Sequence, residues 1–337
     1  MLSKYTGCLL GGAVGDALGA PAEFLFLPDI LHRFGPGGVI DFIEFSDGLG
    51  RITDDTQMTL FTAEGILKAG NKLLTGFPED YLPVMYTSYL RWLHTQSGFI
   101  PQQLKEKPDL TGGLMELKEL FRRRAPGNTC LSALQSGKMG TIDHSINDSK
   151  GCGGVMRVAP VGLIEGLSPE MAFRVAAEAA AITHSHPSGY LPAGALAALL
   201  AFIRKGFPLE EAITRTMTLL GNWKDHGEVL NALAKAVSMA SSMIGTPSFS
   251  LTEKLGGGWT GEEALAISVY CALCFPDDFE KAVILSVNHS GDSDSTGAIT
   301  GNILGFLLGE EAIPSRWLEK LEIREQIRRM AEGLFIL

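Results

Sequence analysis

The stretch SPEMAFRVAAEAAAI, residues 168–182, indicates the fold class more clearly than any other part of the chain. Ser168 is a residue type that caps helices, Pro169 suits the first helical turn, and alanine has the highest helix propensity. Runs of Ala, Leu and Ile at three- and four-residue spacing recur along the chain, and a charged amphipathic segment follows near its end. The helices predicted in this way are residues 168–182, 193–204, 228–244, 263–275 and 315–333.

Period-two alternation, the pattern of a half-buried strand, is almost absent, and Val39–Phe45 is the single candidate strand. Long connections that contain Gly and Pro interrupt the helical pattern at 28–53, 97–113 and 245–259, and loops of such length are often functional. No shift in composition marks a domain boundary. We therefore predict an all-α protein with a single domain, residues 1–337.

Two later helices have recognisable starts. Thr260 followed by Glu263 has the form of a capping box, in which each side chain bonds the other residue's backbone N–H. Asp277 with Glu280 has a similar form one helix further on. Both pairs predict where a helix begins.

Composition excludes several classes of protein. The 337 residues include 28 Lys and Arg against 38 Asp and Glu, so the formal net charge is −10. Nucleic-acid-binding proteins neutralise phosphates with clustered Lys and Arg, so a broad nucleic-acid surface is not expected. The 40 glycines follow no collagen-like period and no low-complexity run, which argues against a fibrous or disordered chain.

The five cysteines indicate a reducing compartment, because their number is odd and their spacing irregular. Cys271 and Cys274 form a C-x-x-C motif without a second pair at zinc spacing, and we interpret them as buried helix residues. The first residues lack a signal-peptide layout, and no uncharged apolar run reaches the length of a membrane span. We expect a cytoplasmic protein without a membrane segment.

Two clusters of carboxylates and hydroxyls each precede an apolar, helix-like run. They are ITDDT at residues 52–56 and NHSGDSDSTG at residues 288–297. Either cluster alone is explained by helix capping, since Thr and Asp bond free amides and suit the helix dipole. Together they offer the hard oxygen ligands that Mg²⁺, Mn²⁺ or Ca²⁺ prefer. The pair therefore predicts a two-metal site built from distant parts of the chain.

Two further motifs are ambiguous by themselves. The loop SKGCGGV at residues 149–155 has glycines that allow a ligand close to the backbone, and its amides could face phosphate oxygens. A tight turn between helices explains it equally well. The segment THSHPSGY at residues 183–190 has two alternating histidines, of which at most one is expected to face a given site. Taken alone, this segment is better explained by a histidine favourable to a helix C-terminus, followed by an ordinary turn.

These four motifs, preceded by GGAVGDALGAPAEF at residues 11–24, resemble in sequence and in order the motifs of the ADP-ribosylglycohydrolase family. The resemblance extends from about residue 4 to residue 309. It implies an all-α orthogonal helical bundle with a binuclear Mg²⁺ site, where Mn²⁺ could substitute. It also implies cleavage of ADP-ribose from modified protein side chains.

The resemblance assigns roles to single residues. Glu23 matches a glutamate for which a catalytic role is implied. Our own hypothesis is that Asp55, or alternatively Glu23, accepts a proton during catalysis, with Asp294 also in the catalytic set. His184 would lie beside the ribose. The metal ligands implied are Thr53, Asp54, Asp55, Asp292, Asp294 and Ser295. The loop implied to bind the diphosphate contributes Ser149, Gly151, Cys152, Gly153, Gly154 and Val155.

The sequence indicates the family more clearly than it indicates which ADP-ribose linkage is cut. The motif HSGDSDSTG resembles the arginine-specific members more than the serine-specific ones, which favours N-linked ADP-ribosylarginine as substrate. Hydrolysis of O-linked ADP-ribose, on serine or in O-acetyl-ADP-ribose, is the alternative. A non-catalytic ADP-ribose-binding protein, similar to the crystallins that resemble this family, is the alternative of a different class. The expected partner is an ADP-ribosylated protein, and a monomer is expected.

Overall fold

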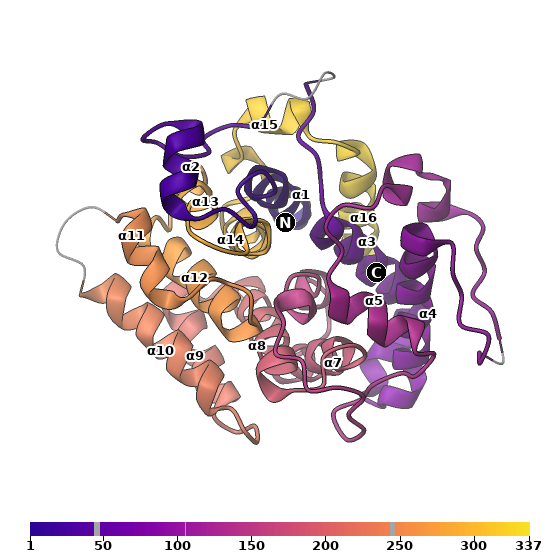
Figure 1. Cartoon of the computed structure of the whole chain (residues 1–337). Helices are drawn as coiled ribbons and strands as arrows, with labels where there is room; N and C mark the ends of the chain where they lie inside the picture. Colours follow the sequence, from indigo (N-terminus) through magenta and orange to yellow (C-terminus); the bar gives the residue numbers. More distant parts are fainter. Residues whose placement is uncertain (44–47, 105, 243–246) are drawn as a thin grey trace.

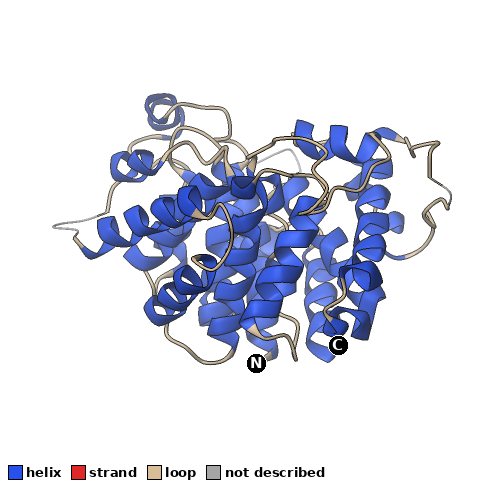
Figure 2. Ribbon diagram, turned by 90° about the horizontal axis from the view of Figure 1, so that it is seen from below, coloured by secondary structure: helices blue, strands red, loops and turns tan. Residues whose placement is uncertain are grey.

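The computed structural model describes residues 1–43, 48–104, 106–242 and 247–337. Within these ranges the chain forms α-helices and short 3-10 helices and no β-strand (Figure 2). Two isolated bridges, Gly50 with Leu321 and Gly151 with Thr260, are the strand-like pairings of this part of the chain. The predicted all-α class is confirmed.

Helices follow one another along the whole chain. The α-helices of the described ranges are α1 (Leu2–Gly19), α2 (Leu27–Phe34), α3 (Asp54–Ala69), α4 (Pro78–Ser97), α5 (Asn128–Gln135), α6 (Ala159–Gly162), α7 (Pro169–Ala181), α8 (Pro187–Arg204), α9 (Leu209–Leu220), α10 (Gly227–Ser241), α11 (Phe249–Thr252), α12 (Gly261–Cys274), α13 (Phe279–Val287), α14 (Ser293–Leu308), α15 (Ser315–Lys320) and α16 (Arg324–Ile336). The 3-10 helices are η1 (Gly70–Thr75), η2 (Gly113–Glu116), η3 (Lys118–Phe121), η4 (Cys152–Gly154), η5 (Glu253–Leu255) and η6 (Glu310–Ala312).

Helices α1 and α14 lie side by side near the centre of the molecule and contact each other more extensively than any other pair (Figure 1). Glycines from both helices lie at this contact, and a methyl group on most of them would overlap the backbone of the opposite helix. The helices run antiparallel, so the end of α1 lies beside the start of α14. The facing glycines are Gly7 and Gly305, Gly11 and Gly301, and Gly15 and Gly297.

The remaining helices surround this pair. Helix α7 packs on α8, α3 on α4, and α10 on α12. Buried apolar side chains form one large cluster that extends from Tyr5 in α1 to Leu334 in α16. The start of α7 is as predicted, because the Ser168 hydroxyl accepts a hydrogen bond from the Met171 N–H at 3.2 Å.

The structure corrects three expected elements. Residues 39–43 of the candidate strand form no strand, and residues 44 and 45 lie outside the described residues. The expected loop 28–53 contains most of α2, whose first turn carries a proline. The expected helix 315–333 is divided into α15 and α16, because Ile323 between them adopts left-handed backbone geometry with φ of 47°.

The two predicted helix starts are only partly correct. Thr260 precedes α12 but makes no side-chain capping bond. Asp278, not Asp277, caps α13, because its side chain accepts a hydrogen bond from the Lys281 N–H at 3.0 Å. Aspartate at either position fits the pattern, and only the backbone geometry decides which of them caps.

The other expected connections and the cysteines also have defined places. Residues 98–104 and 106–112 are without helix, as expected, whereas 245–259 contains α11 and η5 in its described part. Cys271 is buried in α12 and Cys274 is half-buried at its end. No helix in the described ranges is long and apolar enough to cross a membrane.

The glycine contact leads to a prediction for Gly301→Ala. A methyl group there would overlap the Gly11 carbonyl, so α1 and α14 would have to separate. Overpacking of this kind costs about 1–3 kcal/mol of unfolding free energy. Urea denaturation of the wild type and the variant measures it.

Gly227→Ala is the matched control, because this helical glycine has open space around its missing side chain. The control should unfold at the wild-type urea midpoint or slightly above it. Equal midpoints for Gly301→Ala and Gly227→Ala would contradict the role of the glycine contact.

Candidate functional site

A cavity of about 640 Å³ opens where the N-terminal ends of α3 and α14 meet. Its lining includes Asp54 and Asp55 from the first turn of α3, and Asp292, Asp294 and Ser295 from the start of α14. None of these five residues is more than 5% exposed. The structure thus brings together the two Asp-containing motifs that the sequence analysis paired.

The capping interpretation of these motifs is also correct. The Thr53 hydroxyl accepts a hydrogen bond from the Asp55 N–H at 3.3 Å, and the Asp292 carboxylate accepts one from the Ser295 N–H at 3.4 Å. Capping does not satisfy the whole cluster, because Asp55 Oδ1 is buried without a hydrogen-bond partner. A buried carboxylate oxygen in that state costs free energy unless something binds it.

Burial and mutual repulsion disfavour the charged forms of the cluster. Burial, followed by the charge of Asp294, raises the pKa of both Asp55 and Asp292 well above the usual value. Burial also raises the pKa of Asp54, although a hydrogen bond from the Gly127 N–H, 3.0 Å from Asp54 Oδ2, opposes this. A cation bound in the cavity would favour the ionised forms of these carboxyl groups and lower their pKa values.

Glu23 lies at the edge of the same cavity, just beyond the end of α1. Burial, with the charges of Asp294 and Asp292 next in size, raises the pKa of Glu23 to about 10. The carboxyl is therefore neutral at pH 7 when the cavity holds no cation. A bound cation would lower this pKa and make Glu23 available as a base.

The donor set fits a hard divalent cation. It consists of carboxylate and hydroxyl oxygens, one of which, Asp55 Oδ1, has no protein partner. Among the described residues, no three His, Cys, Asp or Glu side chains already have the arrangement of a metal site. The fit therefore rests on the chemistry of the donors and their place around one cavity.

Thr53 is the one predicted metal ligand that does not line this cavity. Its hydroxyl caps α3, and the residue lines a neighbouring cavity instead. The other five predicted ligands all line the carboxylate cavity.

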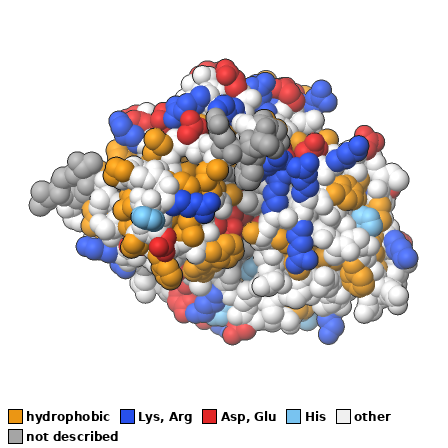
Figure 3. Space-filling model, turned by 45° about the horizontal axis from the view of Figure 1, so that its top comes forward, with side chains coloured by type: hydrophobic (Ala, Val, Ile, Leu, Met, Phe, Trp, Pro, Cys, Tyr) orange, Lys and Arg blue, Asp and Glu red, His pale blue; other side chains and the backbone are white. Residues whose placement is uncertain are grey.

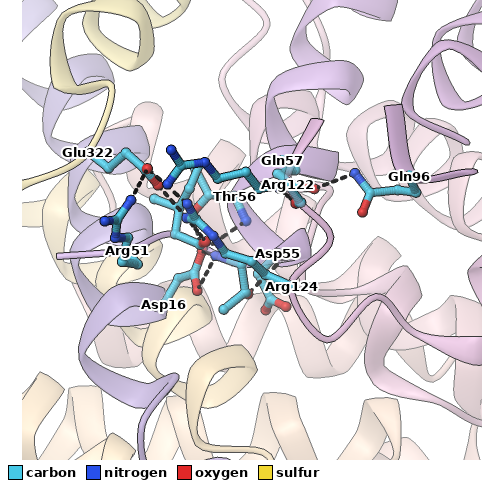
Figure 4. A network of polar contacts seen from close by, with 11 residues as sticks. Asp16, Arg51, Asp55, Thr56, Gln57, Gln96, Arg122, Arg124 and Glu322 are labelled. Atoms are coloured by element: carbon cyan, nitrogen blue, oxygen red, sulfur yellow. Dashed lines mark hydrogen bonds and ion pairs between the residues drawn. The ribbon is translucent and has the colours of Figure 1, made fainter. Parts of the chain in front are cut away.

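Asp16 positions part of the acidic cluster, a role that the sequence analysis missed. It lies fully buried in α1 and accepts hydrogen bonds from the backbone N–H groups of Thr53, at 2.9 Å, and Thr56, at 3.1 Å. The Thr56 hydroxyl also donates to it, so Asp16 holds the first turn of α3 in place beside α1 (Figure 4). A lone carboxylate in the apolar run GGAVGDALGA was the available signal, because a buried charge needs partners.

The glycine loop contributes part of its predicted set. Gly151, Cys152 and Gly153 line the carboxylate cavity opposite Asp54 and Asp55. The remaining predicted loop residues do not line it: the Ser149 hydroxyl bonds the Gly151 N–H at 3.3 Å, Gly154 packs against Gly189, and the Val155 N–H donates to the Cys152 carbonyl at 2.9 Å.

Cys152 connects this loop to the acidic cluster. Burial and the charge of Asp292 raise the pKa of its thiol well above the usual value. The neutral thiol donates to Asp292 Oδ2, with Sγ and Oδ2 2.8 Å apart. The loop and the start of α14 are thereby in direct side-chain contact.

His184 faces the cavity, whereas His186 does not. The backbone N–H of Ser188 donates to His186 Nδ1 at 3.0 Å, so His186 caps α8. Burial and the Arg157 guanidinium lower the pKa of His184 to about 3. His184 is therefore neutral, which contradicts its interpretation as a charged partner of a helix C-terminus.

Two aromatic side chains, also missed from the sequence, lie at the rim. Phe24 and Trp259 both line the cavity and stack with ring centroids 5.3 Å apart. They are 66% and 42% exposed, so both rings are accessible to solvent beside the cavity. Figure 3 shows a hollow on one face of the molecule, in which acidic side chains are visible between apolar side chains and Lys or Arg.

The raised pKa values predict how stability depends on pH. In the unfolded chain Asp and Glu are ionised above about pH 5, whereas folded Asp16, with a pKa of about 7, and Glu23, with a pKa of about 10, still bind protons. The folded state binds more protons, so the unfolding free energy should fall as pH rises from 7 to 8.5 in chelator.

Urea denaturation at both pH values measures this dependence. The lowered pKa values of His184 and His289 act in the opposite direction only below about pH 6.5, so they do not affect this interval. Mg²⁺ should stabilise the protein more at pH 8.5 than at pH 7, since ionised carboxylates bind it better. An unfolding free energy that rises with pH in chelator would contradict the raised pKa values of Asp16 and Glu23.

Comparison with known proteins agrees with this geometry. The family model of ADP-ribosylglycohydrolase matches residues 1–337. The ADP-ribosylarginine hydrolase Tri1 of Serratia proteamaculans is 27% identical, covering 99% of this chain and 79% of that protein. The ADP-ribosyl-(dinitrogen reductase) glycohydrolase of Rhodospirillum rubrum is 26% identical, with coverage of 99% and 96%.

A solved structure described as an ADP-ribosylglycohydrolase-related protein complex has the same fold. Its TM-score is 0.65 at 25% identity, and the match covers 99% of this chain and 98% of that one. Because the family match and the structural match both extend over essentially the whole sequence, this chain belongs to the ADP-ribosylglycohydrolase family of hydrolases.

Proposed function

We propose that this hydrolase depends on Mg²⁺ and removes ADP-ribose from modified arginine side chains. The observation that carries the proposal is the meeting of Asp54 and Asp55, Asp292 and Asp294, and the loop at Gly151 in one cavity. Members of the family are metal-dependent hydrolases, and relatives act on ADP-ribosylated proteins. We thereby propose which ions bind and how many, which linkage is cut, and what single residues do.

Asp54, Asp55, Asp292, Asp294 and Ser295 in the cavity, with Thr53 beside it, are the proposed ligands of two Mg²⁺ ions, which Mn²⁺ could replace. When bound, the ions would hold ribose hydroxyls and orient a water molecule. Thr53 would have to give up its capping bond to the Asp55 N–H in order to take part. Thr53 is therefore the weakest of the proposed ligands.

The glycine loop is the proposed site of the diphosphate. Gly151 and Gly153 have no side chains that would keep an anion away from the backbone, and both line the cavity. His184 is neutral and lies next to both glycines, since a methyl group on Gly153 would be 2.9 Å from its ring. A neutral imidazole can hydrogen-bond a ribose hydroxyl or a phosphate oxygen without adding charge.

Cleavage at the anomeric carbon passes through an oxocarbenium-like state and needs a group that accepts a proton from water. Asp55 is one proposed acceptor, because its Oδ1 is buried and has no protein partner. Glu23 at the edge of the cavity is the other. Asp294 is proposed to orient the reacting groups, since its charge acts on both of these carboxyls.

Arginine is the preferred linkage for two reasons. The motif HSGDSDSTG resembles that of arginine-specific members, and one relative of this chain is named an ADP-ribosylarginine hydrolase. Serine-linked ADP-ribose or O-acetyl-ADP-ribose as substrate, and binding without cleavage, are the alternatives. We also propose that residues 1–337 are one domain, because the main apolar cluster extends from Tyr5 to Leu334.

A direct comparison of substrates tests the function. Release of ADP-ribose from an ADP-ribosylated arginine peptide and from a serine peptide of otherwise equal sequence is measured with Mg²⁺ and then with chelator. Faster, Mg²⁺-dependent release from the arginine peptide is expected. Faster release from serine would overturn the linkage, and binding of ADP-ribose without any release would overturn catalysis.

Asp294→Asn tests the carboxylate cluster, because it removes one charge from the cavity and keeps the shape of the side chain. We expect turnover to fall at least about 100-fold and Mg²⁺ affinity to fall with it. Exposed Asp143→Asn is the matched control and should keep both near the wild-type values. Wild-type turnover in Asp294→Asn would be incompatible with the proposed site.

A further inference from the structure

A second cavity, of about 520 Å³, adjoins the carboxylate cavity at Glu23. Arg123 and Ala125 also line both cavities, so the two spaces are neighbours at this edge. The second cavity differs in charge from the first. Its lining contains the arginines Arg51, Arg122, Arg123 and Arg124, and Glu23 is its one acidic residue among the described residues.

Two of these arginines are structural. Arg124 bonds both carboxylate oxygens of the buried Glu322 and donates to the Ile52 carbonyl at 2.6 Å. Arg51 Nη1 lies 3.2 Å from Glu322 Oε1. Figure 4 shows these guanidinium groups meeting at Glu322. These ion pairs connect the turn between α15 and α16 to the segment before α3.

The neighbouring arginines have no such partner. Arg122 and Arg123 are exposed, and within the described ranges neither side chain forms an ion pair. Their backbone is nevertheless held in place, since the Arg122 carbonyl accepts a hydrogen bond from Gln57 Nε2 at 3.0 Å. Gln57 is itself bonded by Gln96 Nε2 at 2.9 Å. The segment is therefore anchored by its backbone, while two positive side chains face the second cavity.

Arg122 and Arg123 give this edge of the second cavity a local positive charge in a chain whose net charge is −10. An acidic protein repels acidic partners in general, so a local positive group creates a place where such partners can approach. Arginine binds carboxylates through two parallel hydrogen bonds, which adds direction to the attraction. The positive charge favours an acidic occupant, and the position next to the carboxylate cavity favours a polypeptide that continues from a modified side chain bound there.

We infer that the second cavity binds acidic residues that flank the modified side chain of the target protein, with Arg122 and Arg123 as their partners. This inference rests on the proposed function, in which ADP-ribose occupies the carboxylate cavity. The bond to be cut would then lie close to Glu23, and the target chain would continue into the adjoining cavity. The two arginines are thus specificity-determining residues for the target.

The test compares three arginine-linked substrates: free ADP-ribosylarginine, a peptide with glutamate on both sides of the modified residue, and the same peptide with glutamine instead. The wild type should have about fivefold higher kcat/KM for the glutamate peptide than for the glutamine peptide at low salt. The preference should shrink as salt is added. The double variant Arg122→Gln/Arg123→Gln should lose it.

The control removes two exposed charges elsewhere, as Arg33→Gln/Arg329→Gln, and should retain the preference. Arg123→Glu is a second variant, and it should reverse the preference in favour of the glutamine peptide. Free ADP-ribosylarginine separates this inference from the proposed function, because it has no flanking residues.

Three results would overturn the inference. One is a preference for glutamate that persists in the double variant. Another is an equal loss of kcat/KM on all three substrates, since the arginines would then act on ADP-ribose itself. The third is a wild type without turnover on any arginine-linked substrate, which would overturn the proposed function and this inference with it.

Discussion

The close packing of α1 against α14 determines where the acidic cluster lies. Glycines on both helices let the backbones touch, and a side chain at Gly301 or Gly15 would force them apart. The contact aligns the end of α1 with the start of α14. Burial raises the pKa of Asp16, and the charge of Asp294, which this contact brings near, raises it further. The position of the acidic cluster follows from helix packing rather than from a dedicated loop.

The cluster itself combines local and long-range requirements. Asp16 on α1 holds the first turn of α3, which carries Asp55, through hydrogen bonds to its backbone N–H groups. Two helix N-termini then point at one cavity, and their dipoles partly offset the repulsion between the carboxylates. Asp55 Oδ1 remains without a partner. Ionisation of these carboxyl groups is therefore unfavourable without a counter-charge, and a divalent cation bound in the cavity would supply that counter-charge.

Much of the fold and site could be predicted from the sequence because the signals are local. Ser168 and the alanine-rich run after it predict helix α7, and the two Asp motifs are recognisable as short segments. The break at Ile323 depends on one left-handed residue, which composition does not reveal. Asp16 was missed because its role lies in bonds to the start of α3, 37 or more residues away. The second cavity could not be predicted from the sequence. Arg124 forms an ion pair with Glu322, whereas, within the described part of the chain, Arg122 and Arg123 do not, and this difference is visible only in three dimensions.

Anomalous diffraction from crystals soaked in Mn²⁺ would locate the proposed ions. We expect two Mn²⁺ peaks inside the carboxylate cavity, within coordination distance of Asp54, Asp55, Asp292 and Asp294. The distances expected between metal and oxygen are about 2.0–2.3 Å. A cavity that stays free of Mn²⁺ in a crystal of active enzyme, or ions bound only at surface carboxylates, would contradict the proposed two-metal site.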